Sequence, residues 1–199
     1  MSKIKSALEL ALERTADVQV DRDAVRRDSA VKRGKAAAGS RLTDPKSESL
    51  RKIIDETEKD ERDWVKNGIV DTLLANITLP RYETDLDRFP AVADAIREIG
   101  PPKGHDAKNL DYLLEQYSGL FRQYIDNLKQ LEQQLRERWE PRLRQKEQQV
   151  RQQTGQTVRL SADQDPEFSK VLSEELSRLD GQYAEVLAQG KDEIRKLLG

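Results

Sequence analysis

Residues 110–135 read LDYLLEQYSGLFRQYIDNLKQLEQQL, and this stretch decides the fold. Apolar and aromatic residues recur in it at alternating intervals of four and three positions: Leu110, Leu114, Tyr117, Phe121, Tyr124, Leu128, Leu131 and Leu135. Such heptad spacing places the side chains along one narrow stripe of a helix, and coiled coils and long bundles bury a stripe of this kind against a second helix. The stretch therefore predicts an all-α, coiled-coil-like protein built around a long helix.

The long helix is predicted to span 108–152 and to pair with a second helix at 166–198. Asp165, followed by proline and glutamate, is typical of a helix start. The second helix has its own apolar stripe: Phe168, Leu172, Leu176, Leu179, Tyr183 and Val186. Because the connection between the helices is short, we expect a long antiparallel hairpin over 107–199. Counting outward from the connection places Leu135 near Tyr183 and Trp139 near Leu179.

Two residues predict irregularities in these helices. Pro141 lacks a backbone N–H, so we expect a kink near Glu140 or a new helix there. Gly190 weakens the second helix, which indicates a position where another helix comes close. The second helix is also the shorter, so the first turns of the long helix, from Leu110 to about Leu120, should lack a hairpin partner. A face of 46–79 or of 90–99 is the expected cover there.

The N-terminal half is predicted to contain two further parts. Residues 1–45 are expected to form a flexible arm, with a short amphipathic helix at 2–15 and a flexible basic linker at 16–45. The linker prediction rests on the scarcity of large apolar residues and on glycine and proline interruptions. Residues 46–99 regain a helical period and predict a small helical region. The sequence Gly-Pro-Pro-Lys-Gly at 100–104 is the clearest boundary.

The composition favours extended helices over a compact globule. The chain has 199 residues, of which 36% are hydrophobic and 36% charged, so it is poor in core residues compared with an average soluble protein. The net charge of -2 gives no general argument for binding nucleic acid or lipid. Cysteine is absent, and the sequence has no apolar run typical of a signal peptide or membrane span. We expect a soluble, cytoplasmic protein that does not bind membranes.

The residues that carry chemistry give no pattern for a reaction or a metal. His105 is the only histidine, and zinc rarely accepts a site built from carboxylates alone. Residues 34–40 (GKAAAGS) lack the Gly-Lys-Ser/Thr order of a phosphate-binding loop. The acidic clusters lack the calcium-loop pattern. We therefore expect no catalytic, cofactor-binding or metal-ligating residues, no small-molecule substrate and no enzymatic activity.

The sequence predicts a non-catalytic helical scaffold, adaptor or assembly factor that acts through protein–protein contacts. The partner is expected to be another protein or a second copy of the chain, as in a homodimer. Candidate partner-binding residues are those at the uncovered end of the long helix and two on the N-terminal helix: Leu110, Leu114, Tyr117, Phe121, Ile4 and Leu8. For the N-terminal helix itself, docking on its own bundle is favoured over docking on a partner, and contact with a lipid surface is the least favoured alternative.

A second function class rests on the basic run at 26–41. This run carries six cations and one acid, Asp28. Five of the cations are the candidate phosphate contacts of a nucleic-acid-binding or ribosome-associated factor: Arg26, Arg27, Lys32, Arg33 and Lys35. It contains no aromatic residue on which a base could stack, and acidic residues precede it. The scaffold hypothesis is therefore the stronger of the two.

Overall fold

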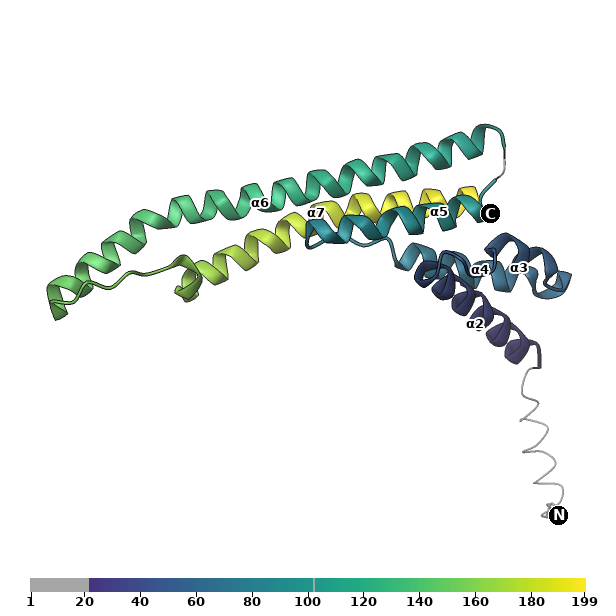
Figure 1. Cartoon of the computed structure of the whole chain (residues 1–199), viewed down its shortest axis with the longest axis horizontal. Coiled ribbons are helices and arrows are strands. Elements are labelled where there is room, and N and C mark those ends of the chain that lie inside the picture. Colours follow the sequence, from purple (N-terminus) through teal and green to yellow (C-terminus); the bar gives the residue numbers. More distant parts are fainter. Residues whose placement is uncertain (1–21, 102) are drawn as a thin grey trace, which may run out of the picture. The chain divides into compact units, whose positions relative to one another are not determined.

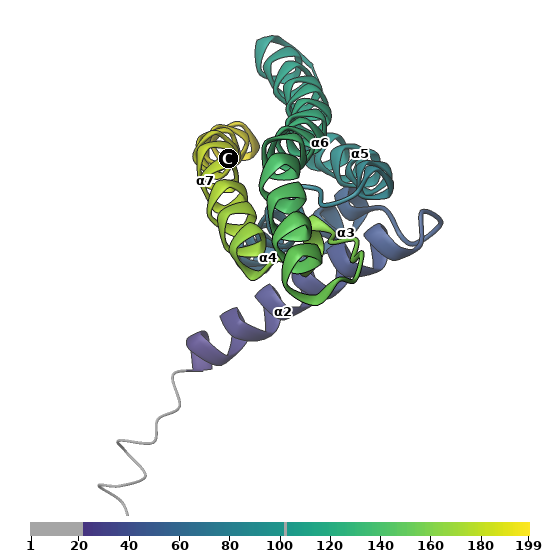
Figure 2. The ribbon, with the colours of Figure 1, turned by 90° about the vertical axis from the view of Figure 1, so that its left-hand side faces the viewer.

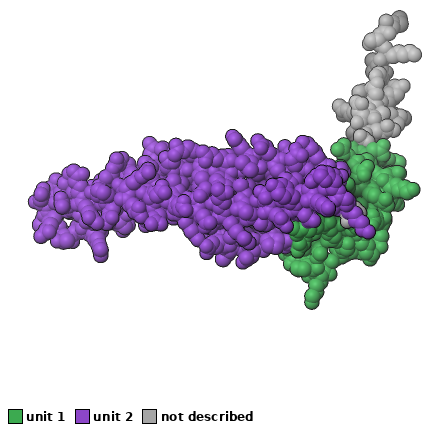
Figure 3. All heavy atoms as spheres, turned by 90° about the horizontal axis from the view of Figure 1, so that it is seen from above, with its two compact units in different colours: residues 1–76, 94–99 green, residues 77–93, 100–199 purple. Residues whose placement is uncertain are grey.

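The computed structural model describes residues 22–101 and 103–199 and confirms the all-α fold, with no strand in those ranges. The helices are α2 (Arg22–Thr43), α3 (Leu50–Glu56), α4 (Lys59–Ala75), η1 (Glu83–Arg88), α5 (Phe89–Ile99), α6 (His105–Thr154), η2 (Ala162–Gln164) and α7 (Pro166–Leu198). They group into two compact units, residues 1–76 with 94–99 and residues 77–93 with 100–199 (Figure 3). Helix α5 contributes residues to both units.

In the first unit, α2 and α4 pack with their backbones in contact. Every fourth residue on one face of α2 is small and buried: Ala30, Gly34 and Ala38. A Cβ atom on Gly34 would overlap the carbonyl oxygen of Val65 and lie 3.1 Å from the amide nitrogen of Ile69. Conversely, a Cβ on Gly68 would overlap the carbonyl oxygen of Val31. The two glycines thus allow a reciprocal close approach, which explains why both positions lack a side chain.

The predicted flexible linker at 16–45 is wrong over residues 22–43, which form α2. The small residues of α2 bring it close enough to α4 for many van der Waals contacts, and these offset the entropy lost on ordering. The division of the chain also differs from the expected one. Residues 77–93 of the predicted small helical region belong to the second unit, and the other described residues of that region belong to the first.

In the first unit, the end of α5 is joined to α2 and α3 by two arginines. Arg41 donates from Nε to a carboxylate oxygen of Glu98 at 2.9 Å, and Arg51 donates to the carbonyl oxygen of Glu98 at 2.8 Å. Burial opposes ionisation of the Glu98 carboxyl, but the hydrogen bonds it accepts, including that from Arg41, outweigh burial and lower its pKa. These contacts hold the last turns of α5 within the first unit.

The second unit contains the predicted antiparallel hairpin, in which α6 and α7 lie side by side (Figures 1 and 2). The N-cap of α7 is Asp165, as predicted, whose carboxylate accepts from the amide N–H of Glu167 at 3.0 Å. The predicted register is wrong. Residues 155–165 return along α6, so that α7 begins beside Trp139, whose ring lies 5.6 Å from that of Phe168.

The observed register brings α7 to the first turns of α6. Tyr183 lies against Tyr124, with ring centroids 5.0 Å apart, about three helical turns from the predicted Leu135. Farther along, the Tyr117 hydroxyl donates to the carbonyl oxygen of Leu187 at 2.7 Å. The first turns of α6 therefore have a hairpin partner, contrary to the prediction.

The four α6 residues predicted to bind a partner are buried within the chain. Leu110, Leu114, Tyr117 and Phe121 are 2%, 1%, 4% and 3% exposed. Phe89, at the start of α5, also covers this region, with its ring 5.1 Å from that of Phe121. The premise that these residues are uncovered is wrong, because each part of α7 lies about three helical turns closer to the N-terminus of α6 than expected. Ile4 and Leu8 lie outside the described residues.

The two predicted irregularities have different outcomes. Helix α6 runs without interruption through Pro141 for 50 residues and curves along its length (Figure 1), so the alternative of a new helix at this point is wrong. The close approach predicted at Gly190 is confirmed. A Cβ atom there would lie 2.5 Å from the hydroxyl oxygen of Tyr117 on α6.

Candidate protein-interaction surface

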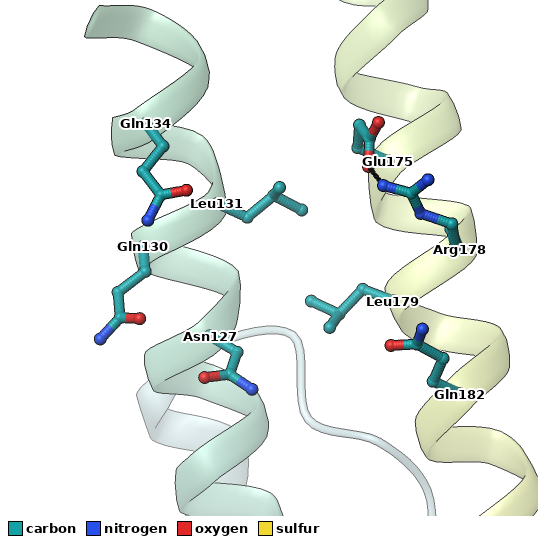
Figure 4. Close-up of a pocket in the computed structure, with 8 residues that line it drawn as sticks. All are labelled: Asn127, Gln130, Leu131, Gln134, Glu175, Arg178, Leu179 and Gln182. Carbon is teal, nitrogen blue, oxygen red and sulfur yellow. Dashed lines mark hydrogen bonds and ion pairs between the residues drawn. The ribbon is translucent and has the colours of Figure 1, made fainter.

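A groove of about 420 Å³ lies between the middle parts of α6 and α7 (Figure 4). Leu131 and Leu179 point toward each other across it. The remaining lining side chains are polar: Asn127, Gln130, Gln134, Glu175, Arg178 and Gln182. Glu175 and Arg178 form an ion pair with each other. The groove therefore combines a small apolar floor with an amide rim and no net charge.

The groove forms where the hairpin has leucines instead of aromatic rings. Rings fill the space between the helices on both sides of it, at Trp139 with Phe168 and at Tyr124 with Tyr183. The intervening core residues are shorter and only half-buried: Leu128, Leu131, Leu172, Leu176 and Leu179. Half-buried leucines in the middle of a hairpin leave apolar surface that a further helix could cover.

Helix α6 carries a second heptad stripe, offset by one residue from the first. Its members are Asn109, Leu113, Gln116, Leu120, Gln123, Asn127, Gln130 and Gln134. All are exposed or half-exposed, and none is charged, although 36% of the chain is. The groove-facing side of α7 continues with the same spacing through Leu179, Gln182, Val186 and Gln189. We call these twelve residues of α6 and α7 the amide face.

Apolar periodicity alone does not reveal the amide face, because six of its eight α6 positions are glutamine or asparagine. The spacing of four and three is nevertheless visible in the sequence once amides are counted with leucines. Val186 alone stands out by exposure, since 51% of this large apolar residue is accessible. None of the six candidate partner-binding residues of the sequence prediction belongs to this face.

A polar cluster beside the aromatic pair joins α6 and α7 to Arg81, which precedes η1. Arg81 donates to both carboxylate oxygens of Asp180, at 3.2 and 2.6 Å, and to the Tyr124 hydroxyl at 3.1 Å. Tyr124 in turn donates to Asp180 at 2.5 Å. Burial and this hydrogen bond raise the pKa of Tyr124 to about 12. Burial disfavours the charged form of Asp180, yet the bonds from Arg81 and Tyr124 lower its pKa. Arg81, Tyr124 and Asp180 thus supply one another's hydrogen-bond partners, which suits a structural role.

The five cations of the predicted nucleic-acid site lie on α2, where acids pair with three of them. Glu61 accepts from Arg26 at 3.0 Å and from Arg33 at 2.5 Å, and Lys32 forms an ion pair with Asp28 at 2.7 Å. Lys35 is exposed.

Arg27 lines a hollow of about 440 Å³ together with Trp64 of α4, an aromatic neighbour that the local sequence does not reveal. Asp23 and Asp28 line the same hollow, and their charges oppose the binding of phosphate.

The described residues also bear on a metal site and on a membrane span. His105 is exposed at the first position of α6. Over 22–101 and 103–199, no three His, Cys, Asp or Glu side chains gather in a way that could hold a metal ion. Within the same ranges, no helix has the length and apolar content needed to cross a membrane.

Comparison with known proteins gives one match. No curated protein and no solved structure matches the chain. Residues 51–196, which include α4, α5, α6, the amide face and most of α7, match a family of unknown function, DUF6657. The match covers well over half of the sequence, and the chain belongs to the DUF6657 family.

Proposed function

We propose that the protein is a non-catalytic, cytoplasmic helical scaffold or adaptor that binds a protein partner through its amide face. The observation that carries the proposal is the neutral groove at Leu131 and Leu179, continued along α6 and α7 by uncharged residues. Burial of apolar area stabilises a contact by about 25 cal/mol per Å², so the half-buried leucines favour covering this groove.

The chemistry of the face selects the kind of partner. Amide side chains donate and accept hydrogen bonds at once, so they can pair with amides, hydroxyls or backbone groups of a second helix. A charged partner surface would lose its hydration without gaining a counter-charge, which costs free energy. The expected partner is therefore a helix whose contact side carries leucines and uncharged polar residues.

Nucleic-acid binding through α2 has weaker support. Three of the five cations proposed for it already pair with Glu61 or Asp28, and two aspartates line the hollow beside Arg27. Phosphate contacts on that helix would have to displace existing ion pairs. In the groove rim, the amide positions of the amide face carry no charge and so have no ion pair to displace, and Asn127 donates a hydrogen bond of 2.7 Å to the Tyr183 hydroxyl.

Two matched variants test the proposal. The face variant combines Gln123→Glu, Gln130→Glu and Gln134→Glu, which add three charges to the amide face while keeping the side-chain shape. The control variant combines Gln145→Glu, Gln149→Glu and Gln152→Glu, which add the same charge to exposed positions of α6 beyond the charged segment 136–144.

Each protein, tagged, is used to capture partners under native conditions, and circular dichroism verifies that helix content is equal. We expect the face variant to lose at least 90% of the partner bound by the wild type, and the control variant to retain it. Equal capture by all three proteins would remove the amide face as the binding surface.

A further inference from the structure

We propose that the amide face binds a second copy of the chain, so that two hairpins pack face to face as a four-helix bundle with two-fold symmetry. The proposal rests on the assignment of this face as a binding surface and adds the identity of its occupant.

Self-complementarity is the first argument. In a two-fold dimer each partner presents the same surface to the other, so a charge near the two-fold axis meets the same charge of the second copy. The eight α6 positions of the amide face carry no charge, and the ion pair of Glu175 with Arg178 neutralises itself. Amides carry donors and acceptors together and therefore complement their own copies. An uncharged surface of this length in a chain with 36% charged residues fits a copy of itself.

The size of the face is the second argument. The stripe from Asn109 to Gln134 is about 38 Å long at 1.5 Å per residue, and α7 widens it to two helices over part of that length. At a helix width of about 11 Å, the resulting area is on the order of 500–600 Å². This is below the roughly 800 Å² that each partner buries in a stable complex, as expected of a reversible dimer.

The heptad spacing is the third argument. Two stripes on one helix, offset by one residue, allow α6 to contact α7 on one side and a helix of the second copy on the other. Amides within such a contact make it weaker than an all-leucine contact, but they fix its orientation, because a shifted register leaves their hydrogen bonds unpaired. A reversible dimer of defined geometry is the expected result.

The absence of cysteine makes the contact directly testable. Single cysteines are introduced on the amide face by Gln116→Cys, Gln123→Cys, Gln130→Cys and Gln134→Cys, with Gln149→Cys as the exposed control on the same helix. A residue near the two-fold axis meets its own copy. We therefore expect at least one face variant to form a disulfide-linked dimer more than fivefold faster than the control under mild oxidation. Equal rates at all five positions would overturn the proposal.

Light scattering of the unmodified protein gives the second readout. We expect twice the mass of a single chain at high micromolar concentration, a monomer for the Gln123→Glu, Gln130→Glu, Gln134→Glu variant, and a dimer for the Gln145→Glu, Gln149→Glu, Gln152→Glu control. A wild-type monomer up to 1 mM, or a face variant that stays dimeric, would refute self-association through this face.

The two proposals fail in different ways. If the wild type is a monomer and the face variant loses a foreign partner that the wild type captures, the dimer is refuted but the amide face remains a binding surface. If the face variant still forms the dimer and still captures the foreign partner, both proposals are refuted.

Discussion

The indole N–H of Trp139 donates a hydrogen bond of 3.2 Å to the buried carboxylate of Asp165, the residue that caps α7. The same carboxylate accepts from Lys146 Nζ at 2.6 Å and from the amide N–H of Glu167 at 3.0 Å. One side chain therefore joins the start of α7 to two positions on α6. This contact fixes where α7 begins, and with it the register that buries Tyr117 and places the groove between Leu131 and Leu179.

The Asp165 cluster predicts a specific dependence of stability on pH. The bonds from Lys146 and Trp139 lower the pKa of Asp165 to about 2, against an ordinary value of 3.8. Because the folded protein holds the proton more weakly than the unfolded chain, this stabilisation is fully present above about pH 4 and is lost as the pH falls toward 2. The Asp165→Asn variant keeps a capping oxygen but has no charge, so it should be less stable than the wild type at pH 5.

Urea unfolding at pH 5, 4, 3 and 2 measures this effect. We expect the difference in unfolding free energy between wild type and Asp165→Asn to shrink steadily over that range. Asp126→Asn, which makes the same charge change at an exposed position of α6, is the control and should show no comparable trend. A wild-type advantage over Asp165→Asn that is unchanged from pH 5 to pH 2 would mean that the carboxylate's charge does not stabilise the hairpin.

The hairpin could be predicted from the sequence, but its register could not. The heptad spacing from Leu110 and the cap at Asp165 are local patterns, and both are confirmed. The register depends on residues 155–165, which run back along α6 instead of turning at its end. That path is set by contacts between distant residues, such as the bond from the Leu160 amide to Glu147 at 2.7 Å, which no periodicity reveals.

The same limit explains the error at α2. Ala30, Gly34 and Ala38 resemble a linker when only large apolar residues count as core. Their burial depends on Gly68 of α4, which permits the close approach from the other side. The amide face was present in the sequence as a heptad pattern, yet its exposure follows only from the register of α7.

The close contact of α2 with α4 predicts opposite effects of alanine at two glycines of one helix. Gly34→Ala places a methyl group on the carbonyl oxygen of Val65, so the helices must separate, at a cost of about 3 kcal/mol or more in unfolding free energy. At Gly39, apart from the adjacent residues and the backbone of its own helix, no atom of the described residues lies within 4 Å of the added Cβ. Gly39→Ala should therefore stabilise the helix by about 0.5–1 kcal/mol.

Chemical denaturation of the two α2 variants and of Gly68→Ala checks this relationship. Because the contact is reciprocal, Gly68→Ala should be destabilising to an extent similar to Gly34→Ala. The loss of unfolding free energy in the variant with both Gly34→Ala and Gly68→Ala should be smaller than the sum of the two single losses, since helices already separated by one methyl group have room for the other. Gly34→Ala as stable as Gly39→Ala would show that α2 does not pack closely on α4 in solution.

Gly190 gives a parallel test inside the hairpin. A Cβ atom there would lie 2.5 Å from the Tyr117 hydroxyl oxygen and 2.9 Å from its Cζ atom, so Gly190→Ala must move the ring and break the bond to Leu187. We expect a loss of about 1–3 kcal/mol in unfolding free energy. Gly181 lies on the same helix, and outside the adjacent residues and the backbone of its own helix no described atom would lie within 4 Å of its Cβ, so Gly181→Ala should instead stabilise the protein by about 1 kcal/mol.

A double-mutant cycle with Tyr117→Phe separates the overlap from the intrinsic preference of the helix. The phenylalanine lacks the hydroxyl that lies nearest the new methyl group, so Gly190→Ala should cost less in that background than in the wild type. The relief should be partial, because the ring carbon at 2.9 Å remains. If Gly190→Ala costs the same in both backgrounds, the side chain of Tyr117 does not lie against Gly190, and the register of α7 on α6 must differ from the one described.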